Sequence, residues 1–237
     1  MRIVVVGGTG LVGSRLVRRL GAAGHAVVVA ARSTGVDIAT GAGLAEALAG
    51  AEIVVDVSNP GYADPGAMLR FFQLSGARLL ASEREAQVRH HVIFSAIGSD
   101  RVGSGYFLAK SAQEALVAAS GIPFTIVRSA PLFETILKII GTGRDQDVVR
   151  VPPLRVQPIA ADDAATVLTR AALRTPEDAV VEVAGPDSYL LEALAEQVLT
   201  ANEDYRPVLL DPQASFFGAR FDDTGLDDWL RRSIAPA

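Results

Sequence analysis

The chain alternates short runs of aliphatic residues with longer segments whose apolar residues recur at helical spacing. The first run, Ile3 to Val6, is continuous and β-branched, which is typical of a parallel strand buried on both faces. After it, Leu16, Val17 and Leu20 have the spacing of one helical face. The same pattern predicts further strands over residues 25–31, 37–38, 53–57, 91–96, 124–127, 179–184 and 207–210. It predicts further helices over residues 43–48, 64–87, 105–119, 131–140, 164–174 and 190–201.

Strands that alternate with helices predict an α/β protein with a doubly wound parallel sheet of the Rossmann type. A chain of 237 residues is long enough for one large core with a small additional lobe. We therefore expect residues 1–237 to form a single NAD(P)-binding unit. Residues 131–157 and 186–237 would contribute a small C-terminal substrate lobe.

Composition narrows the classes of protein that the chain can represent. The hydrophobic fraction of 49% argues against disorder, and no apolar run approaches the ~20 residues that span a bilayer. The chain has no cysteine and a net charge of −5 without a basic block, which excludes disulfides and gives no electrostatic signal for nucleic acid. We expect a cytoplasmic protein that acts on a small molecule, with a homodimer as an open alternative to a monomer.

The turn after the first strand carries glycines at positions 7, 10 and 13. In a strand–turn–helix context this Gly-x-x-Gly-x-x-Gly spacing is typical of a dinucleotide pyrophosphate site. Gly7 permits the sharp turn, Gly10 permits close approach of the phosphates, and Gly13 permits packing of helix against strand. The helix N-terminus then supplies free N–H groups to the anion. We expect cofactor contacts from Gly7, Thr9, Gly10, Leu11, Val12 and Gly13.

The end of the second predicted strand indicates which nicotinamide cofactor is used. This position faces the adenosine ribose, and residues 30–34 contain no acid that could bind a free 2′-hydroxyl. Arg32 can instead bind a 2′-phosphate and Ser33 can add a hydroxyl donor, so we predict NADP(H); an ordinary solvated arginine is the alternative. Asp37 could accept from the adenine amino group or be a turn aspartate. Ser58 and Asn59 end the predicted strand 53–57 on the same edge and are expected to contact the cofactor.

Tyr106 and Lys110 are the strongest catalytic candidates in the chain. They are four residues apart in a predicted helix, so both side chains lie on one face. A tyrosine hydroxyl can act as a general acid or base when a neighbouring ammonium stabilises its phenolate. The chain contains only two lysines among 22 basic residues, which makes a lysine at this spacing informative. The adjacent His90 and His91 point to opposite faces of a strand, and we predict no metal site.

Several segments together resemble the short-chain dehydrogenase/reductases, and more narrowly their atypical, NmrA-like branch. The resemblance covers residues 1 to about 185. It is carried by the glycine motif, Arg32, residues 92–95, Tyr106-x-x-x-Lys110, residues 121–128 and residues 159–165.

This resemblance implies specific roles at the active site. Tyr106 would be the proton donor, and Lys110 would lower the pKa of Tyr106 and bind the nicotinamide ribose. A serine near the end of the strand at 91–96 would bind the substrate carbonyl, and Ser95 is the nearest match. The family places this serine a residue or two further on, where this chain has Ala96 and Ile97. Ser99 and Ser104 are therefore alternatives.

The sequence supports three functions in decreasing order. The first is an NADPH-dependent reductase of a ketone, quinone or enone with Tyr106 as proton donor. The second is a non-catalytic NADP(H)-binding sensor, which some members of the NmrA-like branch exemplify. The third is a redox-neutral epimerase, dehydratase or lyase that keeps its nicotinamide bound.

Overall fold

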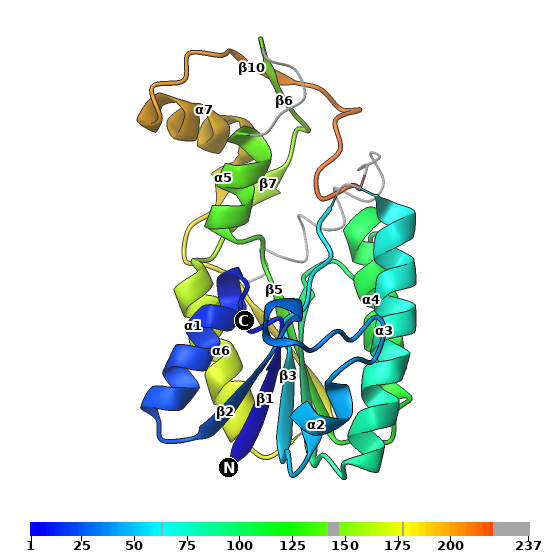
Figure 1. The fold of residues 1–237 in the computed structure, drawn as a ribbon. Coiled ribbons are helices and arrows are strands. Elements are labelled where there is room, and N and C mark those ends of the chain that lie inside the picture. Colours follow the sequence, from blue (N-terminus) through cyan, green and yellow to red (C-terminus); the bar gives the residue numbers. More distant parts are fainter. Residues whose placement is uncertain (63, 142–146, 177, 220–237) are drawn as a thin grey trace.

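A computed structural model places most of the chain around one central sheet (Figure 1). The residues that the structure describes are 1–62, 64–141, 147–176 and 178–219. The predicted tail around Trp229 and the segment 142–146 lie outside these ranges. Within the described part of the chain, no helix is both long and apolar enough to cross a membrane.

The central sheet has six parallel strands in the order β2-β1-β3-β4-β5-β8. The chain pairs β2 with one side of β1 and then crosses to place β3 on the other side, which creates a topological switch point beside β1. This arrangement confirms the predicted doubly wound α/β fold. The strands are β1 (Arg2–Val6), β2 (Ala26–Ala30), β3 (Ile53–Asp56), β4 (His90–Ala96), β5 (Phe124–Ser129) and β8 (Ala179–Val183).

Helices cover both faces of the sheet because its inner strands are apolar on both sides. Val4 and Val6 of β1 face one layer, whereas Ile3 and Val5 face the other. Helices α1 (Leu11–Ala22) and α6 (Ala161–Leu173) lie on the second face. Helices α2 (Leu44–Leu48), α3 (Pro65–Glu85) and α4 (Gly105–Ala118) lie on the first (Figure 1).

A second group of elements lies beyond the carboxyl ends of the sheet strands (Figure 1). It contains α5 (Phe133–Gly141) and α7 (Leu191–Ala201) and two small sheets. One sheet pairs β6 (Val149–Val151) in parallel with β10 (Val208–Leu210), and the other pairs β7 (Arg155–Val156) with β9 (Tyr189–Leu190). The hydrophobic pattern did not predict β6, β7 or β9, because strands of two or three residues are too short to establish an alternation.

The predicted strand at Asp37 and Ile38 is wrong. These residues form no part of the central sheet, and Asp37 makes only an isolated antiparallel bridge to Ala42. The Asp37 carboxylate accepts a hydrogen bond from the Ala39 N–H at 2.8 Å, which closes a local turn. Gly35 and Gly41 flank this turn with φ of +82° and +89°, so the backbone cannot remain extended.

The two adjacent histidines of β4 point to opposite faces, as predicted, and each has a partner in the protein. His90 lies 2.9 Å from the Thr125 hydroxyl, and His91 lies 2.8 Å from the Glu83 carboxylate. Burial alone would lower the pKa of His91, but the Glu83 carboxylate outweighs it and raises that pKa. Both histidines therefore serve the interior of the protein.

Candidate active site

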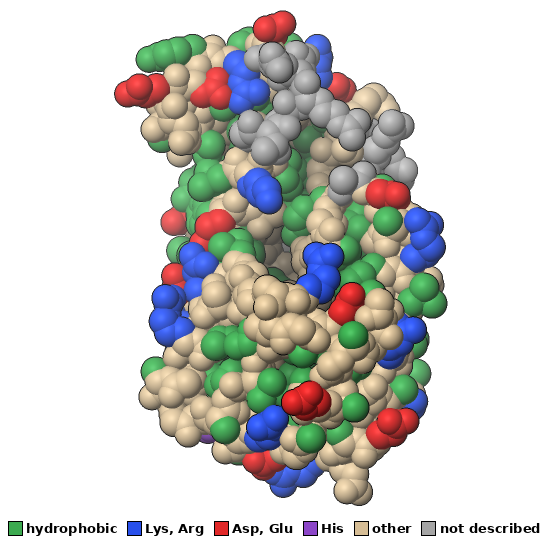
Figure 2. All heavy atoms as spheres, viewed as in Figure 1, with side chains coloured by type: hydrophobic (Ala, Val, Ile, Leu, Met, Phe, Trp, Pro, Cys, Tyr) green, Lys and Arg blue, Asp and Glu red, His purple; other side chains and the backbone are tan. Residues whose placement is uncertain are grey.

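A cleft of about 960 Å³ opens at the carboxyl ends of β1 and β3, where doubly wound sheets bind their ligands. Figure 2 shows the surface hollowed between the sheet and the additional lobe, with hydrophobic side chains beside the hollow. We call it the central cleft. The predicted site residues that line it are Gly7, Thr9, Gly10, Leu11, Val12, Arg32, Ser33, Asp37, Ser58, Asn59, Ser95, Tyr106 and Lys110.

The glycine turn forms one end of the central cleft. Gly7 has a φ of +78°, and its carbonyl accepts a hydrogen bond from the Gly10 N–H at 2.9 Å. Helix α1 then begins at Leu11, with no acidic residue in its first turn. The free N–H groups and positive end of the helix dipole therefore face the cleft without a carboxylate to neutralise them.

Gly13 has a different role from the other two motif glycines. It is buried and does not line the central cleft. A Cβ atom at this position would lie 2.2 Å from the Gly7 carbonyl oxygen and 2.7 Å from Gly8 Cα. Gly13 therefore allows α1 to pack directly against the turn that would hold the phosphates.

Replacing Gly13 by alanine is expected to destabilise the protein by about 1–3 kcal/mol, because the methyl group overpacks a backbone contact. The affinity for a nicotinamide dinucleotide should fall as well, since the turn must move. Thermal unfolding and cofactor titration measure both effects. Gly21→Ala is the matched control, because Gly21 lies in the same helix and its Cβ would meet open space. Equal behaviour of the two variants would contradict this role of Gly13.

The outer end of the central cleft carries the residues predicted to select the cofactor. Arg32 and Ser33 are exposed or half-buried and lie in a short 3₁₀ turn, Arg32–Thr34. The Thr34 hydroxyl fixes this turn by donating to Val29 O at 2.8 Å and accepting from the Ala31 N–H at 3.0 Å. Asp37 also lines the cleft, although one of its oxygens is used in the local turn.

Ser58 and Asn59 follow β3 on the opposite wall of the central cleft. The Ser58 N–H donates to the Asp56 carboxylate at 2.8 Å. Its hydroxyl oxygen is buried and finds no hydrogen-bond partner among the described residues, although buried hydroxyls are nearly always satisfied. Asn59 donates to the Tyr62 hydroxyl at 2.8 Å. The unpaired Ser58 hydroxyl is therefore available to a ligand in the cleft.

These features fit a nicotinamide dinucleotide. The cleft offers a glycine-lined helix N-terminus for a pyrophosphate, a buried hydroxyl without a partner among the described residues, and an arginine beyond the end of β2. Gly7, Thr9, Gly10, Leu11 and Val12 would surround the pyrophosphate. Arg32 and Ser33 would lie toward the adenosine ribose.

Tyr106 lies at the opposite end of the central cleft, in the first turn of α4, with only 8% of its surface exposed. Its backbone N–H donates to Phe217 O at 3.2 Å, and its ring packs edge-on against Tyr62 at 5.0 Å between centroids. Burial is the main cause that raises the pKa of Tyr106 well above 10, and the neighbouring Tyr62 and Asp56 add to it. The expected lowering of this pKa by Lys110 is not present in this arrangement, and the hydroxyl stays protonated at neutral pH.

Lys110 lies one turn further along α4 and is almost completely buried. Its ammonium donates to Phe94 O and to Gln113 Oε1, both at 2.8 Å. It also lies 4.1 Å from the centroid of the Phe72 ring, a cation–π contact. Burial lowers the pKa of Lys110 to about 8, although the Asp56 and Glu114 carboxylates oppose this change.

Ser95 and its alternative Ser99 share one partner within the protein. Both hydroxyls donate to Oε1 of Glu114, at 2.7 Å for Ser99. Arg128 donates to the same carboxylate at 2.7 Å and to Asp100 at 2.8 Å. The Glu114 hydrogen bonds raise the pKa of Arg128, so this arginine stays charged. The Ser95 hydrogen is therefore directed at Glu114, even though Ser95 lines the central cleft.

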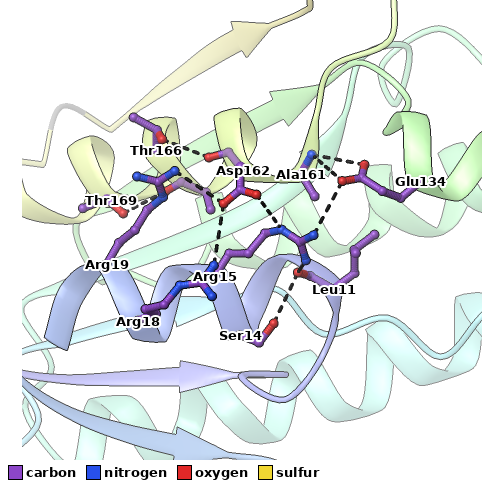
Figure 3. Close-up of polar contacts among 11 residues, drawn as sticks. Leu11, Ser14, Arg15, Arg18, Arg19, Glu134, Ala161, Asp162, Thr166 and Thr169 are labelled. Atoms are coloured by element: carbon purple, nitrogen blue, oxygen red, sulfur yellow. Dashed lines mark hydrogen bonds and ion pairs between the residues drawn. The ribbon is translucent and has the colours of Figure 1, made fainter. Parts of the chain in front are cut away.

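A polar network behind the glycine turn connects three helices (Figure 3). Arg15 of α1 donates to Asp162 of α6 at 3.2 Å and to Leu11 O at 2.7 Å. It also lies 3.8 Å from the carboxylate of Glu134 in α5, and that carboxylate accepts from the Ala161 N–H at the start of α6. The network holds the N-terminus of α1 in a fixed relation to a helix of the additional lobe.

Sequence reasoning missed several residues of the central cleft. Tyr62, Thr135 and Phe217 line the end that contains Tyr106, and Thr135 hydrogen-bonds the Tyr62 hydroxyl. The three residues come from the loop before α3, from α5 and from the segment after β10. No motif connects positions so far apart, and only their packing brings them together.

Residues 3–95 match the family model described as the NAD dependent epimerase/dehydratase family. This match covers β1 to β4 and supports binding of a nicotinamide dinucleotide. The narrower NmrA-like resemblance stays a prediction. A search of curated proteins finds no significant sequence match.

Solved structures share the fold over most of the chain. MoeE5 in complex with UDP-glucose and NAD is 18% identical with a TM-score of 0.74, over 99% of this chain and 100% of that one. The Thermus thermophilus UDP-glucose 4-epimerase in complex with NAD is 17% identical with a TM-score of 0.71, over 100% and 94%. An NADPH-dependent quinone oxidoreductase from Escherichia coli is 19% identical with a TM-score of 0.65, over 89% and 78%. At these identities the likeness establishes the fold.

Proposed function

We propose that this protein is an NADPH-dependent oxidoreductase that reduces a ketone, quinone or enone of a small organic substrate. The observation that carries the proposal is that one cleft contains both a dinucleotide-type glycine turn and the Tyr106–Lys110 pair. The glycine turn lies at one end of the cleft and Tyr106 at the other. A nicotinamide ring extending from the turn toward α4 would therefore meet the substrate beside the tyrosine hydroxyl.

Bound NADPH supplies a hydride to the electrophilic carbon of the substrate. Tyr106 then donates its hydroxyl proton to the oxygen on which negative charge develops. A raised pKa suits this direction of reaction, because Tyr106 holds its proton until a stronger base, the nascent alkoxide or enolate, forms beside it. The Lys110 ammonium stabilises the phenolate that remains, and solvent restores the proton. Ser95 lines the same cleft, but its hydrogen is directed at Glu114.

The residues around Tyr106 favour an apolar substrate. Tyr62, Phe107 and Phe217 each have a ring centroid within 6.2 Å of that of Tyr106. Among the described residues that line the central cleft, the cationic side chains are Arg32, toward the cofactor ribose, and the buried Lys110. This lining offers an aromatic surface to a flat, uncharged carbonyl compound and little to a diphosphate.

The test of the proposed activity is NADPH oxidation by the purified protein across a panel of ketones, quinones and enones. We expect turnover with at least one apolar member of the panel. Tight NADPH binding with no turnover of any member would favour the non-catalytic sensor.

A redox-neutral reaction is the second candidate, because residues 3–95 match a family of epimerases and dehydratases. An enzyme of this kind retains its nicotinamide and returns the hydride within one catalytic cycle. Copurification of a nicotinamide nucleotide that does not exchange with added NADPH would favour it. Stoichiometric oxidation of added NADPH would exclude it as the main reaction.

Replacing Arg32 by alanine is expected to weaken NADPH binding by about 10–100-fold, the loss of a charge-assisted contact of roughly 1.5–3 kcal/mol. NADH binding should change little, because NADH lacks the 2′-phosphate. Titration of both cofactors by nicotinamide fluorescence measures the difference. Arg18→Ala is the control, because Arg18 is exposed on α1 and does not line the central cleft. Equal losses of the two cofactors in the Arg32 variant would contradict the assignment.

A further inference from the structure

A chain of buried polar groups lies beneath Lys110 and ends at the carboxylate of Asp56. We propose that Asp56 and Gln113 are positioning residues that orient the Lys110 ammonium and keep it protonated at the floor of the central cleft. This inference rests on the proposed function for the catalytic use of Lys110. The contacts that carry it belong to the protein alone.

The side chain of Gln113 is the link in this chain. It lies three residues after Lys110 in α4, so both side chains leave the helix on the same side. Gln113 Oε1 accepts from the Lys110 ammonium at 2.8 Å, and Gln113 Nε2 donates to Asp56 Oδ2 at 2.8 Å. The amide thus has one orientation that satisfies both partners, since its oxygen cannot donate and its nitrogen cannot accept.

The Asp56 carboxylate connects this chain to the cofactor wall of the cleft. Its second oxygen, Oδ1, accepts from the Ser58 N–H at 2.8 Å. One carboxylate at the end of β3 therefore holds the backbone of Ser58 and, through Gln113, the ammonium on α4. Asp56, Lys110 and Gln113 are each no more than 2% exposed, so water does not screen their charges.

The charges around Lys110 explain why a second carboxylate is needed. Glu114 of α4 also favours the ammonium, but its oxygens are occupied by Arg128, Ser95 and Ser99. The other charged groups near Asp56 are Glu83 of α3 and His91 of β4, which bind each other. Tyr106 is the remaining titratable neighbour of Lys110, 5.6 Å from ring centroid to ammonium. Asp56 is thus the anion whose hydrogen bonds lead to Lys110.

The direct test is to measure the protonation of Lys110 by NMR on protein labelled with ¹³C and ¹⁵N in lysine. The chain has only two lysines, Lys110 and Lys138, so a Lys138→Arg variant assigns both signals. The pKa of Lys110, about 8 in the unmodified protein, is expected to fall by about one unit in Asp56→Asn, because an attractive charge is lost. Gln113→Met keeps the length of the side chain and removes both hydrogen bonds, and it should lower this pKa in the same direction.

Glu83→Gln is the matched control for these variants. It also removes a buried carboxylate, but Glu83 binds His91 and not the chain of groups that leads to Lys110. We expect the pKa of Lys110 to stay unchanged in this variant. Thermal unfolding of all variants separates a loss of folding from a change in protonation.

The outcomes separate this inference from the proposed function. An unchanged pKa of Lys110 in folded Asp56→Asn and Gln113→Met would overturn the positioning role, whatever the protein catalyses. A lowered pKa in both, with Tyr106→Phe fully active, would support the positioning role and remove the proposed proton donor. If the protein is a reductase, the alkaline limb of its kcat profile should move to lower pH in Asp56→Asn.

Discussion

Turnover by a Tyr106→Phe variant is expected to fall by about 10²–10⁴-fold, the usual contribution of a positioned general acid. The change removes one oxygen and keeps the ring that packs against Tyr62, Phe107 and Phe217. NADPH affinity should therefore stay close to that of the unmodified protein, and KM should change less than kcat. Steady-state kinetics with the substrate found in the panel, together with NADPH titration, measures these effects.

Tyr62→Phe is the matched control for this prediction. Tyr62 is a second tyrosine in the same end of the central cleft, but its hydroxyl is bound by Asn59 and Thr135. We expect a much smaller loss of kcat in this variant. If Tyr62→Phe lost turnover and Tyr106→Phe did not, Tyr62 would be the proton donor. Full activity of both variants would rule out a tyrosine donor.

The second large effect is expected at Glu114, which holds together the ends of β4, β5 and α4. Replacing Glu114 by alanine leaves Arg128, whose side chain is 13% exposed, without its main partner, and it frees the hydroxyls of Ser95 and Ser99. Removal of one member of a buried ion pair costs about 3–5 kcal/mol. We expect about 3 kcal/mol, the low end of that range, because Arg128 keeps Asp100. For a chain of this length the loss corresponds to a fall in Tm of about 6–12 °C.

Glu182→Ala is the control for the Glu114 variant. Glu182 also pairs with Arg128, but at 3.6 Å and with 47% of its side chain exposed, so its removal should cost less than about 1 kcal/mol. Thermal or urea unfolding compares the two variants. Similar destabilisation of both would mean that Arg128 is not selectively held by Glu114.

Local pattern alone identified the part of the site that is built from continuous sequence. The β-branched run before Gly7 and the helical spacing after Gly13 specify a strand, a turn and a helix within about twenty residues. The spacing of Tyr106 and Lys110 likewise places both on one face of a helix without reference to the rest of the chain. These predictions need only the conformational preferences of glycine and aliphatic residues.

Tertiary structure decided the partners of these residues. Sequence spacing cannot show that Ser95 and Ser99 both donate to Glu114. It cannot show that Gln113 connects Lys110 to Asp56, which is 57 positions away from it. The predicted strand at Asp37 failed for a related reason, since a two-residue apolar pattern does not reveal whether a neighbouring strand is available for pairing.

The sequence by itself determined the strand–turn–helix that begins the fold, the parallel α/β class, and the Tyr106–Lys110 pair. Those features follow from contacts between residues near each other along the chain. The depth of the central cleft, the aromatic groups around Tyr106 and the charge that faces Lys110 were decided only in the folded protein. The reason is that burial and electrostatic interactions depend on distance in space, and the packing of distant segments sets that distance.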